Sequence, residues 1–156
     1  MDKKEMVNNT LDMAHYKKHL WVSIAFLPLF LTVCITGFFS PDGGVVALSF
    51  MLLLLIYLPA IAYNVYKVKA LQKDPDRYEL LEATAVRAHH AIGAGRGAMY
   101  FEVVITSEDG GKVFLETNGV FSRALLAENY YKDYEDQKIH ILYDRTTGTV
   151  LVLKDK

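Results

Sequence analysis

Hydrophobic positions crowd together in the first half of the chain and alternate with polar positions in the second. Between Leu20 and Tyr66 there is no Lys, Arg or Glu, and Asp42 is the only acid. Two apolar runs fill this stretch, Leu20–Phe39 and Val45–Tyr66. A helix rises about 1.5 Å per residue, so each run forms a helix roughly 30 Å long, which matches the thickness of a bilayer core. The pattern therefore predicts two transmembrane helices.

The segment between the two runs, Ser40–Gly44, reads SPDGG and is a turn by its chemistry, because proline fixes φ and glycine accepts positive φ. A link this short makes the two helices an antiparallel hairpin. Lysines flank the outer ends of the hairpin, at Lys17, Lys18, Lys67, Lys69 and Lys73. The positive-inside rule then predicts a two-pass protein of the bacterial plasma (inner) membrane with both termini in the cytoplasm.

Other features of the membrane segment leave some alternatives open. A cleaved signal peptide competes for the first run, but that run is too long for a signal core and no A-x-A-like site follows it. Residues 1–19 form a cytoplasmic N-terminal arm that is either an interfacial helix or a flexible segment. Pro28 and Pro59 lie one in each run, where we expect them to bend the helices. No Asp, Glu, Lys, Arg or His lies inside either run, which argues against an ion or proton path.

After a linker at residues 67–77, apolar and polar residues alternate as they do in β-strands. Residues 78–156 are therefore predicted to form a cytoplasmic β-domain. In the first strand the alternation places Leu81, Ala83 and Ala85 on one face, and in the second it places Met99, Phe101, Val103 and Ile105 together. The predicted strands are Leu80–His90, Met99–Thr106, Lys112–Thr117, Lys138–Asp144 and Thr149–Leu153.

Turn chemistry separates these strands. The pair Asp109 and Gly110 is a strong hairpin signal between the second and third strands. Between the third and fourth strands, Ser122–Gln137 predicts a short helix with Ser122 as its cap. The fold class is an α+β membrane protein, in which a transmembrane helical hairpin precedes a small five-stranded β-barrel of OB or SH3-like type. An open five-stranded sheet is the alternative.

Two stretches of the β-domain carry a family resemblance: FEVVITSEDGGKVFLET, residues 101–117, and KIHILYDRTTGTVLVL, residues 138–153. Together with the two apolar runs, they resemble small bacterial two-helix membrane proteins of uncharacterised families with a C-terminal cytosolic β-barrel. The layout is also similar to that of NfeD-like proteins, in which an OB-type domain follows membrane helices. The resemblance implies a fold and a location, and it hands over no catalytic residues.

Charge and cysteine content narrow the range of partners. Residues 1–73 carry a net charge of +3 and residues 74–156 one of −4, in agreement with −1 for the whole chain. Domains of OB type bind single-stranded nucleic acid through basic grooves with stacking aromatics, so an acidic β-domain does not favour that partner. Cys34 is the only cysteine, which excludes an intramolecular disulfide.

Gly93–Gly97 reads GAGRG and at first resembles a phosphate-binding loop. A dinucleotide fingerprint needs G-x-G-x-x-G between a strand and a helix, whereas here the spacing is G-x-G-x-G and a strand follows. We therefore expect a hairpin loop that exposes Arg96 to a partner. His89 and His90 are strand neighbours that point to opposite faces, and His140 points outward from another strand. No metal site is expected from these histidines.

Three tyrosines, Tyr130, Tyr131 and Tyr134, lie among acids in the segment Glu128–Asp136. They either pack over the open end of the barrel or form a docking face for another protein. No nucleophile elbow or other catalytic set stands out in the sequence. We therefore expect neither enzymatic activity nor a cofactor.

The sequence as a whole predicts a membrane-anchored, non-enzymatic interaction or accessory module. Its expected partners are the lipid bilayer and either another protein or further copies of the chain, while nucleic acid is not expected. The alternative is a sensor of a small ligand or nucleotide that uses the Gly93–Gly97 loop with His89 or His90.

Overall fold

The computed structural model describes residues 2–39, 43–93, 96–106, 110–118, 120–122 and 134–154 of the 156-residue chain. The chain divides into two compact units. The β-unit comprises Met1–Ala14 and Asp74–Lys156, and the helical unit comprises His15–Lys73. The segment at the start of the chain thus belongs to the same unit as the β-domain.

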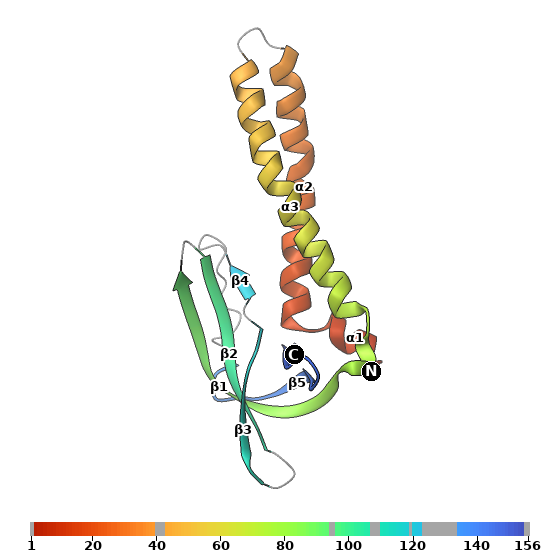
Figure 1. Ribbon diagram of the computed structural model, residues 1–156, viewed down its shortest axis with the longest axis vertical. Coiled ribbons are helices and arrows are strands. Elements are labelled where there is room, and N and C mark those ends of the chain that lie inside the picture. Colours follow the sequence, from red (N-terminus) through yellow and green to blue (C-terminus); the bar gives the residue numbers. More distant parts are fainter. Residues whose placement is uncertain are drawn as a thin grey trace. The chain divides into compact units, whose positions relative to one another are not determined.

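Two long helices make up the helical unit, and each has 29 residues (Figure 1). Helix α2 spans Leu11–Phe39, beginning in the β-unit, and helix α3 spans Gly44–Gln72. Both continue through their internal prolines, Pro28 and Pro59, without a break in helical structure. Each is long and apolar enough to cross a membrane, and only 6% of its apolar window is buried inside the protein.

The two helices pack against each other in antiparallel fashion, as the short link predicts. The ring of Phe30 contacts those of Phe50 and Tyr57, with centroid distances of 5.7 and 5.1 Å. Near the turn, a Cβ added to Gly37 would lie 2.9 Å from the Cβ of Ala47, so only glycine permits this approach. Small residues at a helix crossing are the usual means by which apolar helices pack closely in lipid.

The β-unit is built on a curled antiparallel sheet (Figure 1). Its strands run in the order β3-β2-β1-β5-β6, and the short strand β4 pairs with β2 on the same side as β3. Because β5 returns to lie beside β1, the first strands form a Greek key. The strands are β1 (Glu79–Gly93), β2 (Arg96–Thr106), β3 (Lys112–Glu116), β4 (Val120–Ser122), β5 (Lys138–Asp144) and β6 (Thr149–Val152).

Strand β1 connects the two halves of the sheet. Residues Glu79–Thr84 pair with β5, and Thr84–Gly93 pair with β2. The register shifts between Ala85 and Arg87, which marks a bulge at Val86. A bulge bends its strand and increases the local twist, so it lies where the sheet changes from one partner strand to the other.

One face of the sheet carries the core that the alternation predicts. The completely buried residues include Ala85, Phe101 and Val103, and Tyr134 packs against the same cluster. The cluster is formed by Leu11, Ala83, Ala85, Phe101, Val103, Ile139, Ile141, Val150 and Val152. Leu11 is the one member that does not come from a strand, and it belongs to the beginning of α2.

The N-terminal segment wraps around the β6 edge of the sheet. The backbone N–H of Lys154 donates to the carbonyl of Asn9 at 2.9 Å, and Thr10 forms a β-bridge with Leu153. Before this point lies helix α1, Lys3–Asn8, whose Val7 is fully buried. The segment is therefore a structural part of the β-unit, a packing that neither an interfacial helix nor a flexible arm anticipates.

Within the described residues, the predicted helix between the third and fourth strands is misplaced. Ser122, expected to cap it, is the last residue of β4. Residues 123–133 lie outside the described part of the chain, and Glu135 and Asp136 form a turn before β5. The described helices of the β-unit are instead α1, the first residues of α2, and a short 3-10 helix η1, Pro75–Arg77.

Candidate functional site

The histidine predicted to flank the glycine segment, His89, is part of a cross-strand cluster. It lies directly opposite Tyr100 in the β1–β2 ladder, and the two rings stack with centroids 5.0 Å apart and planes 13° from parallel. Its Nε2 lies 3.6 Å from Oε2 of Glu102. Cross-strand pairs of this kind stabilise a sheet, and each of them contributes about 0.2–1 kcal/mol. The side chain of His90 lies outside the described part of the structure.

The strands on either side of the glycine segment form a hairpin, as predicted, but their ladder continues into the segment that was expected to be the loop. Strand β1 ends at Gly93, which pairs with Arg96 at the start of β2, and Ile92 pairs with Gly97. Residues 94 and 95 and the side chain of Arg96 lie outside the described part of the chain. Since a strand follows the glycines, they do not lie at a helix N-terminus, where backbone N–H groups would bind phosphate.

Of the three predicted docking tyrosines, only Tyr134 falls on described residues. Its ring meets the buried ring of Phe101 edge to face, with centroids 6.2 Å apart. This contact supports packing over the core rather than a docking face. Tyr130 and Tyr131 lie outside the described residues.

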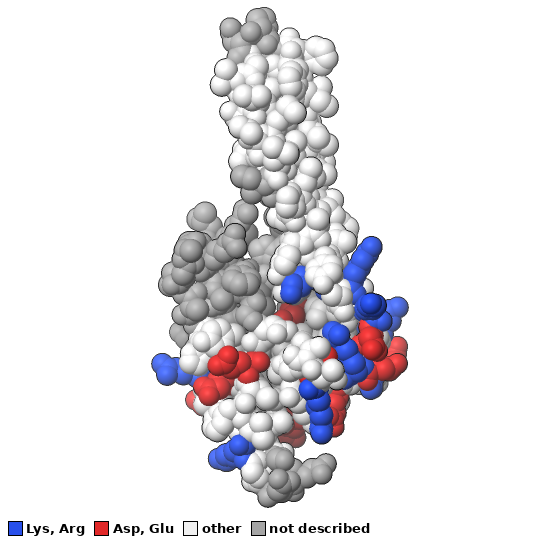
Figure 2. Space-filling model, in the orientation of Figure 1, with Lys and Arg blue, Asp and Glu red and all other residues white. Residues whose placement is uncertain are grey.

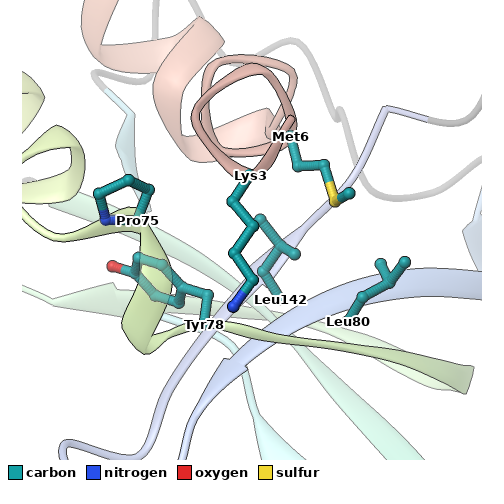
Figure 3. A pocket seen from close by; sticks show the side chains of 6 residues that line it. All are labelled: Lys3, Met6, Pro75, Tyr78, Leu80 and Leu142. Atoms are coloured by element: carbon teal, nitrogen blue, oxygen red, sulfur yellow. The ribbon is translucent and has the colours of Figure 1, made fainter. Parts of the chain in front are cut away.

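A small apolar pocket lies between the N-terminal segment and the outer face of the sheet (Figure 3). Its walls are Lys3, Met6, Pro75, Tyr78, Leu80 and Leu142. The Nζ of Lys3 donates a hydrogen bond to the backbone carbonyl of Asp76, on the adjacent η1, at 2.9 Å. The cavity volume is about 40 Å³. Small-molecule sites typically enclose about 300–1,000 Å³, so the pocket is best understood as the seat of α1.

The buried carboxylate of Asp144 organises the turn between β5 and β6. It accepts hydrogen bonds from the hydroxyl of Thr147 at 2.6 Å and from the backbone N–H of Thr146 at 2.9 Å. The guanidinium of Arg77 lies 3.5 Å away. The hydrogen bond from Thr147 lowers the pKa of Asp144, helped by backbone N–H groups and by Arg77, while burial opposes the shift. These partners give the carboxylate a structural role.

A second pair of histidines lies in the helical unit, where sequence reasoning confined to the β-domain missed it. His15 and His19 are four residues apart on α2, and their ring centroids lie 4.3 Å apart. Tyr16 also contacts Tyr63 of α3, whose ring lies 5.5 Å from the Nζ of Lys67. The spacing H-x-x-x-H was the available signal. No group of three potential metal ligands occurs among the described residues.

The chain matches no protein-family model, no curated protein and no solved structure. The role of each candidate site is therefore inferred from the geometry of the site itself. Among the described residues, the contacts of His89, Tyr134 and Asp144 stabilise the fold. Among the described residues, the exposed apolar surface of α2 and α3 is a large feature that the packing of the protein itself does not explain.

Proposed function

We propose that this protein is a membrane-anchored, non-enzymatic interaction or accessory module. The hairpin of α2 and α3 crosses the bacterial inner membrane and holds the β-unit at its cytoplasmic face. One observation carries the proposal: each helix has an apolar window of which only 6% is buried inside the protein. On the face drawn in Figure 2, charged side chains gather on the β-unit, and the helical unit bears none over most of its length.

The exposure of these helices argues against a soluble fold. Trp21 and Leu55 are more than two-thirds exposed, and large apolar side chains line both helices. Contiguous apolar surface of this extent is not stable in water and marks a membrane or protein contact. A core helix of a soluble protein would pass the same length and hydropathy criteria, but its side chains would be buried.

The packing of the N-terminal segment argues against a cleaved signal peptide. Val7 and Leu11 are buried within the β-unit, and Asn9 and Thr10 bond to the end of the chain. Cleavage after α2 would remove these residues from a domain that contains them. The first apolar helix is therefore best regarded as a permanent span.

The same packing supports the orientation of the two spans relative to each other. Residues before α2 and residues after α3 belong to one unit, so both lie on one side of the membrane. Only an even number of crossings satisfies this condition, and two helices provide it. The lysines that flank the hairpin assign that side to the cytoplasm by the positive-inside rule.

The strand order favours an OB-like domain over an SH3-like one. A five-stranded, partly open Greek-key barrel is the description of the OB fold, and β3-β2-β1-β5 is a Greek key. The NfeD-like resemblance implies the same type of domain after membrane helices. For the sensor alternative, which rests on Gly93–Gly97 with His89 or His90, the described residues offer no helix N-terminus after the glycines, because strand β2 follows them.

Membrane insertion and orientation are tested together in bacterial cells. Alkaline phosphatase, which is active only outside the cytoplasm, is inserted after Asp42 in one fusion and joined after Lys156 in another. We expect activity only from the insertion after Asp42, and the unfused chain should stay in membranes washed at alkaline pH. Extraction of the chain by that wash, or activity of the C-terminal fusion, would refute the anchored arrangement.

A further inference from the structure

The two edge strands of the sheet, β6 and β3, differ in whether their outer edge is covered. At β6, the N-terminal segment covers the edge through the Thr10–Leu153 bridge and the hydrogen bond from Lys154 to Asn9. At the other end, β3 pairs with β2 on one side only within the described residues. An unpaired strand edge presents backbone N–H and C=O groups that are available to a further strand.

Strand β3 also exposes apolar side chains. Phe114 is 59% exposed and Val113 is 41% exposed. Neither the ammonium group of Lys112 nor the carboxylate of Glu116 has an ion pair or side-chain hydrogen bond with any described residue. The strand KVFLE thus begins with an unpaired positive charge, ends with an unpaired negative charge and has an exposed aromatic ring at its centre.

This sequence is complementary to itself when it runs antiparallel. If two copies pair about a twofold axis at Phe114, Lys112 of each lies opposite the partner's Glu116. The same register places the two Phe114 rings opposite each other, and Val113 of each opposite the partner's Leu115. Opposite charges and aromatic pairs at directly facing positions stabilise antiparallel strands.

The charges on the neighbouring strand point to the same arrangement. Glu116 lies directly opposite Glu102 of β2, and like charges at facing positions are unfavourable. On the other side of Glu102 lies Arg87, so the row across the sheet reads positive, negative, negative. A second copy would add the partner's Lys112 beside Glu116, so that a positive charge flanks the two carboxylates on each side.

We propose that a second copy of this chain is the occupant of the β3 edge, joined by antiparallel β3–β3 pairing. The two sheets become one continuous sheet, and because the contact is isologous the assembly closes as a dimer. The inference rests on the proposed function only in naming the protein partner of the module. Confinement to a membrane raises the effective concentration of the two copies and favours the contact.

Disulfide cross-linking in membranes tests the pairing. In a Cys34→Ala background, Phe114→Cys should give a covalent dimer on mild oxidation, because facing Cβ atoms in antiparallel strands are about 4.5–5.5 Å apart, near the reach of a disulfide. Val86→Cys is the matched control, since Val86 is also exposed, at 40%, but lies on β1. Equal cross-linking of the two variants would overturn the proposal.

Charge exchange makes the test independent of the cysteine. In the Phe114→Cys chain, Lys112→Glu or Glu116→Lys alone should slow dimer formation roughly three- to tenfold, since each places like charges at both facing positions. The double exchange Lys112→Glu with Glu116→Lys should restore it. Single exchanges without effect, or a double exchange that stays slow, would overturn the proposal, as would a β3 edge filled by a different protein.

Failure of this inference is distinguishable from failure of the proposed function. A chain that stays in alkaline-washed membranes but forms no Phe114→Cys dimer leaves the anchored module standing and removes the second copy. A chain that leaves the membrane but still cross-links in the predicted register removes the membrane anchor and leaves the β3–β3 pairing standing. Melting of each variant by circular dichroism confirms that the exposed substitutions leave the fold unchanged.

Discussion

At the residue scale, the acid sensitivity of the β-unit depends on Asp144. Its hydrogen bonds hold the pKa of the folded carboxylate below its value in the unfolded chain, which is about 4. The resulting stability is present above the unfolded pKa and is lost as the pH falls through the folded pKa. Asp144→Ala should lower the free energy of unfolding by about 1–3 kcal/mol at neutral pH and flatten its decline below about pH 4.

Pulse proteolysis of the detergent-solubilised chain in urea, repeated from pH 7 to pH 3, measures this effect. The matched control is Arg145→Ala in the same turn, which removes an exposed ion pair with Glu79 at 2.8 Å. Exposed pairs contribute little, so the control should cost less than about 1 kcal/mol. Equal losses in the two variants would show that the buried carboxylate has no special role.

Thr117 closes the ladder between β2 and β3 with its side chain. Its Oγ1 accepts the backbone N–H of Phe101 at 2.8 Å, and its own N–H donates to the carbonyl of Phe101 at 2.9 Å. Both residues are buried. Thr117→Val removes the acceptor at nearly constant volume and should cost about 1–3 kcal/mol in the same urea assay. Thr117→Ser keeps the hydroxyl, so a loss as large as that of valine would contradict this account.

At the element scale, local patterns were sufficient for most of the fold. Period-two alternation located β1 and β2, because strands such as β2 bury one face more deeply than the other. Turn signals located the later predicted strands, such as the hairpin of β5 and β6. Strand β4 has only three residues, which is too short for alternation to be recognised. The ends of β1 and β2 extend into the glycine segment, because the pairs Ile92–Gly97 and Gly93–Arg96 continue the ladder through residues typical of turns.

The N-terminal segment was harder to place, because its apolar residues at helical spacing suit a lipid surface and a protein surface equally. The missed signal lies in β5 and β6, where consecutive residues such as Ile141 and Leu142 are both buried. A strand buried on both faces reads as a continuous apolar run and needs a cover on each side. The apolar run therefore predicts that another segment covers the second face, but it does not predict which segment.

The contribution of the segment is measurable at Leu11, which the core cluster includes although it lies outside the strands. Leu11→Ala should destabilise the β-unit by about 2–5 kcal/mol, the usual cost of a cavity in a packed core. Lys4→Ala on the exposed side of α1 is the control and should stay within about 0.5 kcal/mol. If protease resistance of the β-unit is the same in both variants, the segment is not part of its core.

At the scale of the whole molecule, the number of spans and the stability of the β-unit are coupled. The core needs residues from both ends of the hairpin, so in the proposed membrane arrangement the two ends emerge on the same side of the bilayer. Deleting residues 40–66 leaves one span and separates the N-terminal segment from the strands. Replacing residues 15–73 by a Gly/Ser linker of about 20 residues, with a mean reach of roughly 25 Å, leaves none and lets the two meet.

We therefore expect the protease resistance of the β-unit to depend on whether the number of spans is even or odd. The β-unit should resist protease with two spans and with none, and it should be cleaved readily with one span, although the one-span chain retains every residue of the β-unit. Leu11→Ala should weaken the chain without spans, as it weakens the full chain, and it should have no further effect on the one-span chain, in which Leu11 already lies across the membrane. A one-span chain as resistant as the full chain would mean that the strands fold without the N-terminal segment, and the argument for two crossings would then rest on hydropathy and lysine placement alone.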